Sequence, residues 1–120
     1  MDRTEIGATL VPRLIALDVH SGARQAVLEG LPGTVTMRSG LVSLEPGESV
    51  GRHCTASCEE VLVVLAGAGV MRFTAHETLP LQAPCAAYCP PETEHDVTNT
   101  GRVPLRYVYV VARAGRSHAV

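Results

Sequence analysis

Two stretches of the sequence decide most of what this chain can be. Residues 47–67 read GESVGRHCTASCEEVLVVLAG, and residues 90–99 read PPETEHDVTN. The first stretch combines a histidine, two adjacent glutamates and an apolar run between two glycines. The second places a histidine shortly after a pair of prolines. Imidazole and carboxylate groups are common ligands of transition-metal ions, so the two stretches predict one site built from distant parts of the chain.

The spacing within these stretches resembles the two signatures of the cupin superfamily. The first signature is written G-x5-H-x-H-x(3,4)-E-x6-G, and the second is written G-x5-P-x-G-x2-H-x3-N. Seven residues of this chain match them: Gly47, His53, Glu60 and Gly67 in the first, and Pro90, His95 and Asn99 in the second. The resemblance covers roughly residues 37–111. It implies an all-β fold, the single-domain jelly-roll barrel known as a double-stranded β-helix, with a metal pocket inside it.

The chain departs from the signatures at three positions. Thr55 replaces the second histidine of the H-x-H pair, Glu92 replaces the glycine of P-x-G, and Pro84 stands where the second signature opens with glycine. The loss of one imidazole changes the metal site that the resemblance implies. Because side chains alternate along a strand, Thr55 is expected to face the same pocket as the preceding signature histidine, and we assign it to the substrate pocket.

The remaining ligands implied by the resemblance are His53, Glu60 and His95. Two imidazoles and one carboxylate form a facial set that binds Fe(II) with open positions, and Mn, Ni or Zn also suit these donors. Glu59 competes with Glu60 for the carboxylate role. The six-residue gap to Gly67 favours Glu60, but residues 61–65 are apolar at every position, so alternation cannot decide. The two histidines have a simpler interpretation as hydrogen-bonded polar residues inside a barrel without metal.

Short segments rich in Val, Leu, Thr and Tyr alternate with Gly- and Pro-containing turns, a pattern typical of a β-sandwich or barrel. The predicted strands are Arg13–Val19, Gln25–Leu28, Thr34–Leu44, Ser49–Cys54, Glu60–Leu65, Gly69–Thr74, Ala86–Cys89, His95–Asn99 and Leu105–Ala112. Residues 22–29 are also compatible with a helical turn or two. We expect residues 1–36 to pack on the barrel as strands or an arm, residues 37–113 to form its core, and residues 114–120 to form a tail.

Composition restricts the partners. A net charge of −2 gives no electrostatic reason to expect nucleic acid or an anionic membrane. No apolar run approaches the roughly 20 residues of a membrane-spanning helix, and no secretory signal opens the chain, so we expect a cytoplasmic protein. All ten basic residues are arginine, which excludes a Schiff-base lysine. The run at 61–65, apolar on both faces, needs a second covering layer and predicts a homodimer.

The other polar residues have weaker signals. The four cysteines form two C-x3-C pairs (Cys54 with Cys58, Cys85 with Cys89), whose spacing is unusual for zinc, so we interpret them as apolar thiols. The remaining histidines, His20, His76 and His118, lie outside the signatures and are expected in solvent. Glu94 and Asp96 flank the second signature histidine and are candidates to orient its ring.

Two kinds of function fit these observations. The first is a metal-dependent cupin enzyme, an oxygenase, lyase or isomerase, acting on a small polar or carboxylate-bearing molecule. The second is a ligand-binding or sensory cupin without turnover, with or without metal. The chain has no Trp, three Tyr and one Phe, which favours a small guest over a sugar that needs an aromatic platform.

Overall fold

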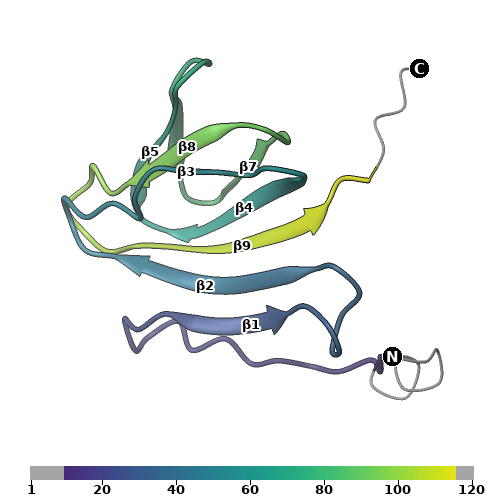
Figure 1. Cartoon of the computed structure of the whole chain (residues 1–120). Helices are drawn as coiled ribbons and strands as arrows, with labels where there is room; N and C mark the ends of the chain where they lie inside the picture. The colour runs from purple at the N-terminus through teal and green to yellow at the C-terminus, as the bar shows by residue number, and fades with distance from the viewer. Residues whose placement is uncertain (1–9, 116–120) are drawn as a thin grey trace.

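The computed structural model describes residues 10–115, and its regular structure there consists of β-strands alone (Figure 1). The strands are β1 (Gln25–Glu29), β2 (Arg38–Leu44), β3 (His53–Cys54), β4 (Cys58–Ala66), β5 (Ala68–Phe73), β6 (Leu79–Gln82), β7 (Cys85–Cys89), β8 (Glu94–Thr98) and β9 (Leu105–Arg113). The predicted all-β fold is confirmed. Within the described residues there is also no helix that could cross a membrane.

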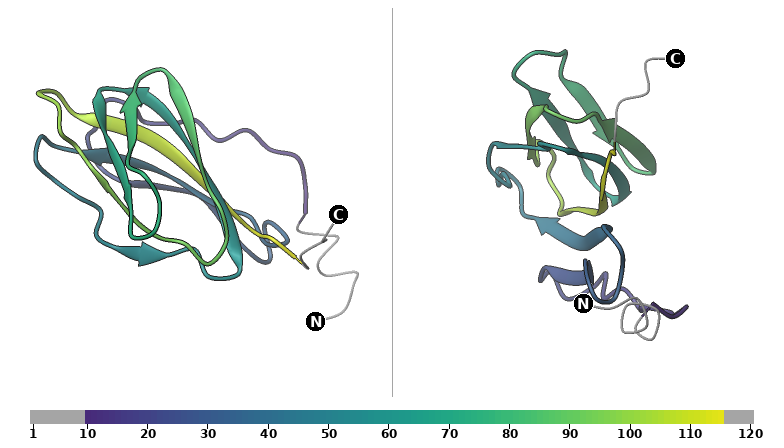
Figure 2. Two further views of the ribbon diagram at one scale, coloured as in Figure 1. Left: turned by 90° about the horizontal axis from the view of Figure 1, so that it is seen from above. Right: turned by 45° about the vertical axis from the view of Figure 1, so that its right-hand side comes forward.

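The strands form two antiparallel sheets that face each other. One sheet has the order β1-β2-β9-β4-β7, and the other has the order β3-β8-β5-β6. This crossing of the chain between two sheets is the jelly-roll arrangement. Figure 1 and the right-hand view of Figure 2 show β1 and β2 extending the larger sheet below the smaller one. A cavity between the sheets is lined in part by residues of β1, β2 and β3.

The core lies between the sheets and follows strand alternation. On β4, Leu62 and Val64 are almost fully buried, whereas Val63 and Leu65 are about 40% exposed on the outer face. The inward residues of the other strands complete one apolar cluster: Val42, Leu44, Met71, Leu81, Ala87, Cys89, Val97, Leu105 and Tyr107. The apolar run at residues 61–65 thus supplies the core from one face only, and its other face contributes to the surface.

Two of the matched signature residues shape turns. Asn99 is buried, and its Nδ2 donates to the carbonyl oxygens of Leu44 and Val103, while its Oδ1 accepts the Gly101 N–H. Gly67 has a φ of 84°, and a Cβ there would lie 2.4 Å from the Pro104 carbonyl oxygen. Asn99 thus ties the turn before β9 to the end of β2, and Gly67 allows the chain before β5 to approach the same turn closely.

Glu92 occupies the position where the signature has glycine, and its φ of 53° explains that preference. A left-handed backbone costs a residue with a Cβ about 1–2 kcal/mol relative to its usual conformations. The Glu92 N–H donates to the Ala56 carbonyl oxygen at 2.8 Å, which helps to hold this conformation. The chain therefore keeps the turn of the signature without its glycine.

Several strand boundaries differ from prediction. The predicted strand Arg13–Val19 is wrong: this segment lies beside β1 through the Gln25 side chain, which bonds the Ala16 carbonyl and the Asp18 N–H in place of a ladder. The helical alternative for residues 22–29 is also wrong, because β1 occupies residues 25–29 and residues 22–24 are not helical. Prediction missed β6, in which Pro80 is tolerated because β6 is an edge strand.

Candidate metal centre

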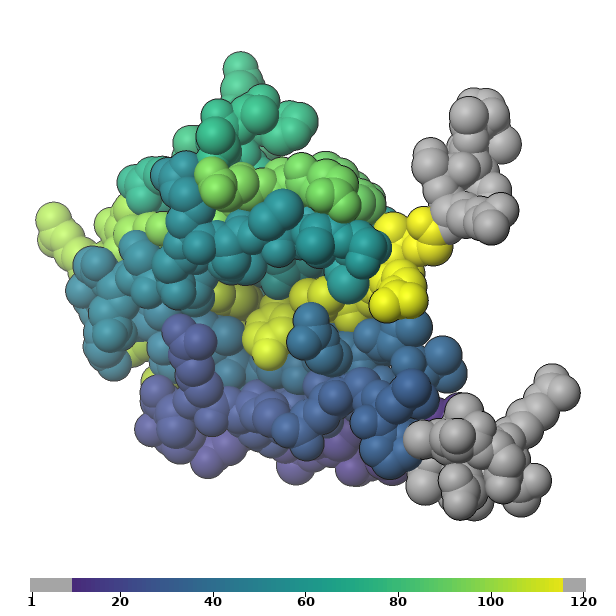
Figure 3. All heavy atoms as spheres, viewed as in Figure 1, coloured from purple at the N-terminus to yellow at the C-terminus, as the bar shows by residue number. Residues whose placement is uncertain are grey.

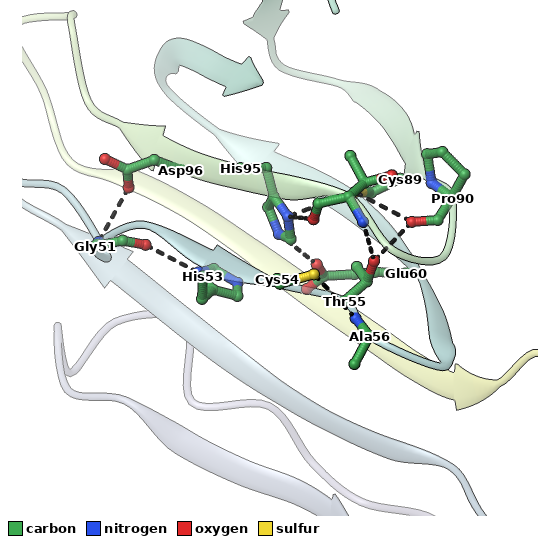
Figure 4. A network of polar contacts seen from close by, with 11 residues as sticks. Gly51, His53, Cys54, Thr55, Ala56, Glu60, Cys89, Pro90, His95 and Asp96 are labelled. Carbon is green, nitrogen blue, oxygen red and sulfur yellow. Dashed lines mark hydrogen bonds and ion pairs between the residues drawn. The ribbon is translucent and has the colours of Figure 1, made fainter. Parts of the chain in front are cut away.

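The three predicted ligand side chains converge from both sheets (Figure 4). His53 on β3 and His95 on β8 are directly paired across the smaller sheet, and their ring centroids lie 4.2 Å apart. Glu60 approaches from β4 in the larger sheet. One candidate ligand atom from each residue lies within 4.8 Å of the other two. Glu60 and His95 are buried, whereas His53 is exposed, so the cluster has one accessible face.

His53 is held by the backbone that precedes it. Its Nδ1 lies 2.8 Å from the Gly51 carbonyl oxygen, so Nδ1–H donates and Nε2 keeps its lone pair. The Gly51 N–H in turn donates to Asp96 Oδ1 at 3.0 Å. Gly51 has a φ of 102°, which interrupts the predicted strand Ser49–Cys54 and leaves only His53–Cys54 in β3. Asp96 therefore anchors Gly51, the residue whose carbonyl oxygen orients His53.

His95 is buried and bonded at both ring nitrogens. Its Nδ1 lies 3.0 Å from the Thr93 carbonyl oxygen, and its Nε2 lies 2.9 Å from Glu60 Oε1. Burial has the largest influence on the pKa of His95 and lowers it, but the hydrogen bonds to Glu60 and Thr93 together with the Glu60 charge raise it above its ordinary value. A proton thus bridges His95 and Glu60, at the place where a cation would be held.

Two further ionisable groups border the cluster. Burial, followed by the Glu60 and Cys54 charges, raises the pKa of the Cys89 thiol to about 11. The Cys89 sulfur lies 3.5 Å from Nδ1 of His95, on the ring edge away from Glu60. Burial and the Glu60 charge raise the pKa of Tyr107, against which the Arg24 charge acts. Both groups keep their protons near neutral pH.

The competing carboxylate points elsewhere. Glu59 accepts a hydrogen bond from the Tyr88 hydroxyl at 2.7 Å on the outer face of the larger sheet, and only Glu60 joins the cluster. Tyr88 is 54% exposed there. The structure thus separates two adjacent residues whose roles the apolar run could not separate.

Thr55 stands at the position of the missing histidine, and its hydroxyl is hydrogen-bonded to main-chain groups on both its donor and its acceptor side. Its hydroxyl donates to the Pro90 carbonyl oxygen at 2.7 Å and accepts the Thr93 N–H at 3.0 Å. The Thr55 N–H also donates to the Thr93 carbonyl oxygen, the group that orients His95. Thr55 borders the cavity, and its role in a substrate pocket stays a prediction.

Neither acidic neighbour of His95 orients its ring. Glu94 instead pairs with Arg52 at 3.4 Å and accepts the Thr74 hydroxyl, which together lower the pKa of its carboxyl. Asp96 acts on Gly51, as described above. The orienting group of His95 is a backbone carbonyl, which residue identity cannot reveal.

The remaining predicted residues contribute no ligand to the cluster. All four cysteines are free thiols: Cys89 is buried, Cys58 and Cys85 are half-buried, and Cys54 is exposed. No other group of metal-ligating side chains occurs among the described residues. His20 and His76 are exposed, as predicted, and His118 lies outside the described residues.

A cavity of about 680 Å³ opens beside the cluster. In Figure 3 a hollow lies between the blue residues of the N-terminal strands and the teal residues around β3, with yellow atoms of β9 visible inside it. Its volume falls in the range typical of small-molecule sites. The lining residues that sequence reasoning did not assign to the pocket include Arg24, Arg38 and Tyr107. Alternation along β9 could have placed Tyr107, but the arginines depend on strand pairing.

The fold and this cluster define a jelly-roll protein with a candidate metal pocket between its sheets. The cupin domain family matches residues 40–111, more than half of the chain, and the chain belongs to that family. No curated protein matches it.

Solved structures agree with this assignment. A "predicted oxalate decarboxylase" from Thermotoga maritima is 26% identical with a TM-score of 0.60, over 63% of this chain and 65% of that chain. The match thus spans just under two thirds of that protein. A Bacillus halodurans protein is 22% identical with a TM-score of 0.72, over 91% and 88%. A "Cupin 2 conserved barrel domain protein" from Salinispora arenicola is 18% identical with a TM-score of 0.69, over 87% and 91%. The last two show the fold alone.

Proposed function

We propose that this cupin holds a divalent metal ion at His53, Glu60 and His95 and binds a small polar or carboxylate-bearing molecule beside it. The observation that carries the proposal is the convergence of three ligand atoms within 4.8 Å at the wall of a cavity. The structure of the donors fits a cation. Each histidine has a backbone carbonyl acceptor at Nδ1, which leaves Nε2 directed to the cluster.

The three proposed ligands differ in their burial and in the side of the site that they form. Glu60 and His95 form its buried wall, while His53 forms the side that faces the cavity. The set has the composition that suits Fe(II), Mn, Ni or Zn, and three protein ligands leave open positions for a guest. When bound, the ion supplies Lewis-acid chemistry, and iron or manganese also supplies redox chemistry. An oxygenase, lyase or isomerase activity is compatible with this arrangement.

The second candidate is a ligand-binding cupin without turnover. This candidate is favoured because the ionisable groups beside the cluster stay protonated near neutral pH. The raised pKa values of Cys89 and Tyr107 keep both groups protonated, so neither is a general base near neutral pH. The His95–Glu60 pair is itself used to hold the ion. Measured turnover of any guest in the metal-loaded protein would decide for the enzyme.

Two adjacent glutamates provide the test of the metal site. We expect Glu60→Gln to weaken Mn²⁺ and Zn²⁺ binding at least about tenfold in calorimetric titration, because a neutral amide is a poor ligand and removes the only carboxylate of the cluster. Glu59→Gln is the matched control and leaves the affinity unchanged, since Glu59 lies on the outer face. Equal affinities of the two variants contradict the proposed site.

We also propose that the outer face of the larger sheet forms a homodimer interface. Val63, Leu65 and Tyr88 are 40%, 42% and 54% exposed on neighbouring strands of that face. Such a patch is typical of interaction surfaces. Light scattering across a hundredfold dilution tests it: a dimer mass that Val63→Glu converts to a monomer supports the interface, and a monomer at every concentration contradicts it. The predicted cytoplasmic location and domain boundaries stay predictions.

A further inference from the structure

The N-terminal strands bring two arginines to the cavity. Arg24 precedes β1 and Arg38 opens β2, and both line the same cavity as the three-residue cluster. Among residues 10–115 the only ion pairs are Arg52 with Glu94 and His95 with Glu60. Within the described part of the chain, neither Arg24 nor Arg38 therefore has a carboxylate partner.

Strand register places Arg38 in line with the cluster. Arg38 pairs with Val111 across β2 and β9, and Val111 pairs with Glu60 across β9 and β4. Paired residues of adjacent strands share a face of the sheet. Two strand spacings of about 4.8 Å put the Cα atoms of Arg38 and Glu60 about 10 Å apart on the cavity side. The Arg38 stem lies beside Gly30, just after β1, and rotation of the side chain over Val111 would bring its guanidinium toward the cluster.

Arg24 borders the same cavity four residues along the ladder from Arg38, about 13 Å away at roughly 3.3 Å per residue. Gln25 pairs with Leu41, so Arg24 lies at the next step of the ladder, beside Val42, whose partner on β9 is Tyr107. The positive charge of Arg24 acts on the Tyr107 hydroxyl, against the larger effects of burial and the Glu60 charge on its pKa. Its guanidinium thus acts electrostatically on a buried group of the cavity wall.

The other charged residues of the lining differ from these two. Arg52 donates to the Thr74 hydroxyl and pairs with Glu94, so its charge is already engaged. Glu29 is opposite Arg38 in the β1–β2 ladder but forms no ion pair with it in the described structure. Among the described residues that line the cavity, Arg24 and Arg38 are therefore the arginines without an ion-pair partner, and Glu29 is the only carboxylate outside the metal cluster.

We propose that Arg38 and Arg24 bind an anionic group of the guest, so that the pocket selects short dicarboxylates. One carboxylate occupies the open side of the metal cluster, and the second is bound by the guanidinium groups at the rim of the cavity. The fork of an arginine matches a carboxylate in a bidentate geometry. The inference rests on the proposed metal pocket for the first carboxylate, whereas the arginine rim is a separate element outside the three ligands.

The test compares two four-carbon probes that differ in one carboxylate. Succinate and butyrate are titrated calorimetrically into Mn²⁺-loaded and metal-free protein, with malonate and glutarate to vary the length. We expect succinate or one of its two length variants to bind at least about tenfold more tightly than butyrate, the contribution of about one charge-assisted hydrogen bond. Arg38→Gln and Arg24→Gln should each reduce this preference, and the double variant should abolish it. Butyrate binding should not change.

Arg52→Gln is the matched control, because it removes a cavity-lining charge that is already paired. It should keep the preference, and all variants should melt like wild type because these side chains are exposed. If no dicarboxylate exceeds butyrate, or if the preference survives in the double variant, the inference is overturned. If Mn²⁺ fails to bind, the metal proposal fails separately. Arginine-dependent succinate binding by metal-free protein would then still support the rim, and its absence there would overturn it.

Discussion

Replacing Thr55 by valine tests why a hydroxyl stands where the signature has histidine. Valine keeps the size and branching of the side chain, so the change removes the hydroxyl alone. Two hydrogen bonds are lost, the one to the Pro90 carbonyl oxygen and the one from the Thr93 N–H. The bond to the Pro90 carbonyl oxygen contributes about 0.5–1.5 kcal/mol, and the buried Thr93 N–H left without a partner costs about 1–3 kcal/mol.

Together these terms predict a loss of about 2–4 kcal/mol in the free energy of unfolding. For a domain of this size, 1 kcal/mol lowers the melting temperature by about 4 °C, so the expected drop is about 8–16 °C. Urea unfolding of the metal-free protein gives the free energy directly. Thr55→Ser is the matched control: it keeps the hydroxyl and loses one methyl group, which costs about 1 kcal/mol.

Metal binding should also respond to this change. Thr55 holds the segment whose Thr93 carbonyl orients His95, so Thr55→Val should weaken Zn²⁺ binding although Thr55 is not a ligand. Thr55→Ser should keep most of the affinity. The reasoning is refuted if Thr55→Val unfolds within about 0.5 kcal/mol of wild type, the range of surface substitutions.

Three further predictions follow from the same structure. Gly67→Ala should destabilise the fold by at least about 2 kcal/mol more than Gly47→Ala. Both glycines have a left-handed backbone, but only at Gly67 would the new methyl group collide with a carbonyl oxygen. Equal losses of unfolding free energy in urea would contradict this. Asp96→Ala should weaken metal binding about tenfold, because it releases Gly51, whose carbonyl oxygen holds His53. Asp96→Asn keeps the acceptor and should keep most of the affinity; an unchanged Kd in Asp96→Ala would exclude this role. The raised pKa of His95 stabilises the metal-free fold below about pH 6.5, and this contribution is lost as the pH rises through the raised value. Metal binding displaces the same proton, so the metal affinity should increase as the pH rises through this range, while the melting temperature of the metal-free protein falls. If the melting temperature and the metal affinity changed in the same direction with pH, the result would be inconsistent with the His95–Glu60 pair.

The fold was predictable from the sequence because several signature residues are required by the backbone geometry of particular turns, which fixes their spacing. Gly67 and Asn99 shape a turn, so their positions are set by the chain and are visible as a pattern. The segment at residues 13–19 was mistaken for a strand because its apolar residues resemble one. The segment contacts β1 through the Gln25 side chain instead of through backbone hydrogen bonds, and the amino-acid composition does not distinguish the two cases.

The sequence indicated the candidate ligands of the site but not the groups that orient them. His53 and His95 were identified from spacing, and the choice between Glu59 and Glu60 needed the structure because both faces of β4 are apolar. The groups that orient the histidines are backbone carbonyls, which carry no sequence signal. Arg38 reaches the pocket through a register across three strands, which only the pairing of distant segments reveals.

X-ray diffraction at the zinc absorption edge, from crystals soaked with Zn²⁺, tests the central claim most directly. The account predicts one anomalous peak between the two sheets, about 2.0–2.1 Å from a ring nitrogen of His53 and of His95 and about 2.0–2.2 Å from an oxygen of Glu60. A peak elsewhere with none at this position, or no bound zinc at a concentration that saturates ordinary protein sites, would contradict it.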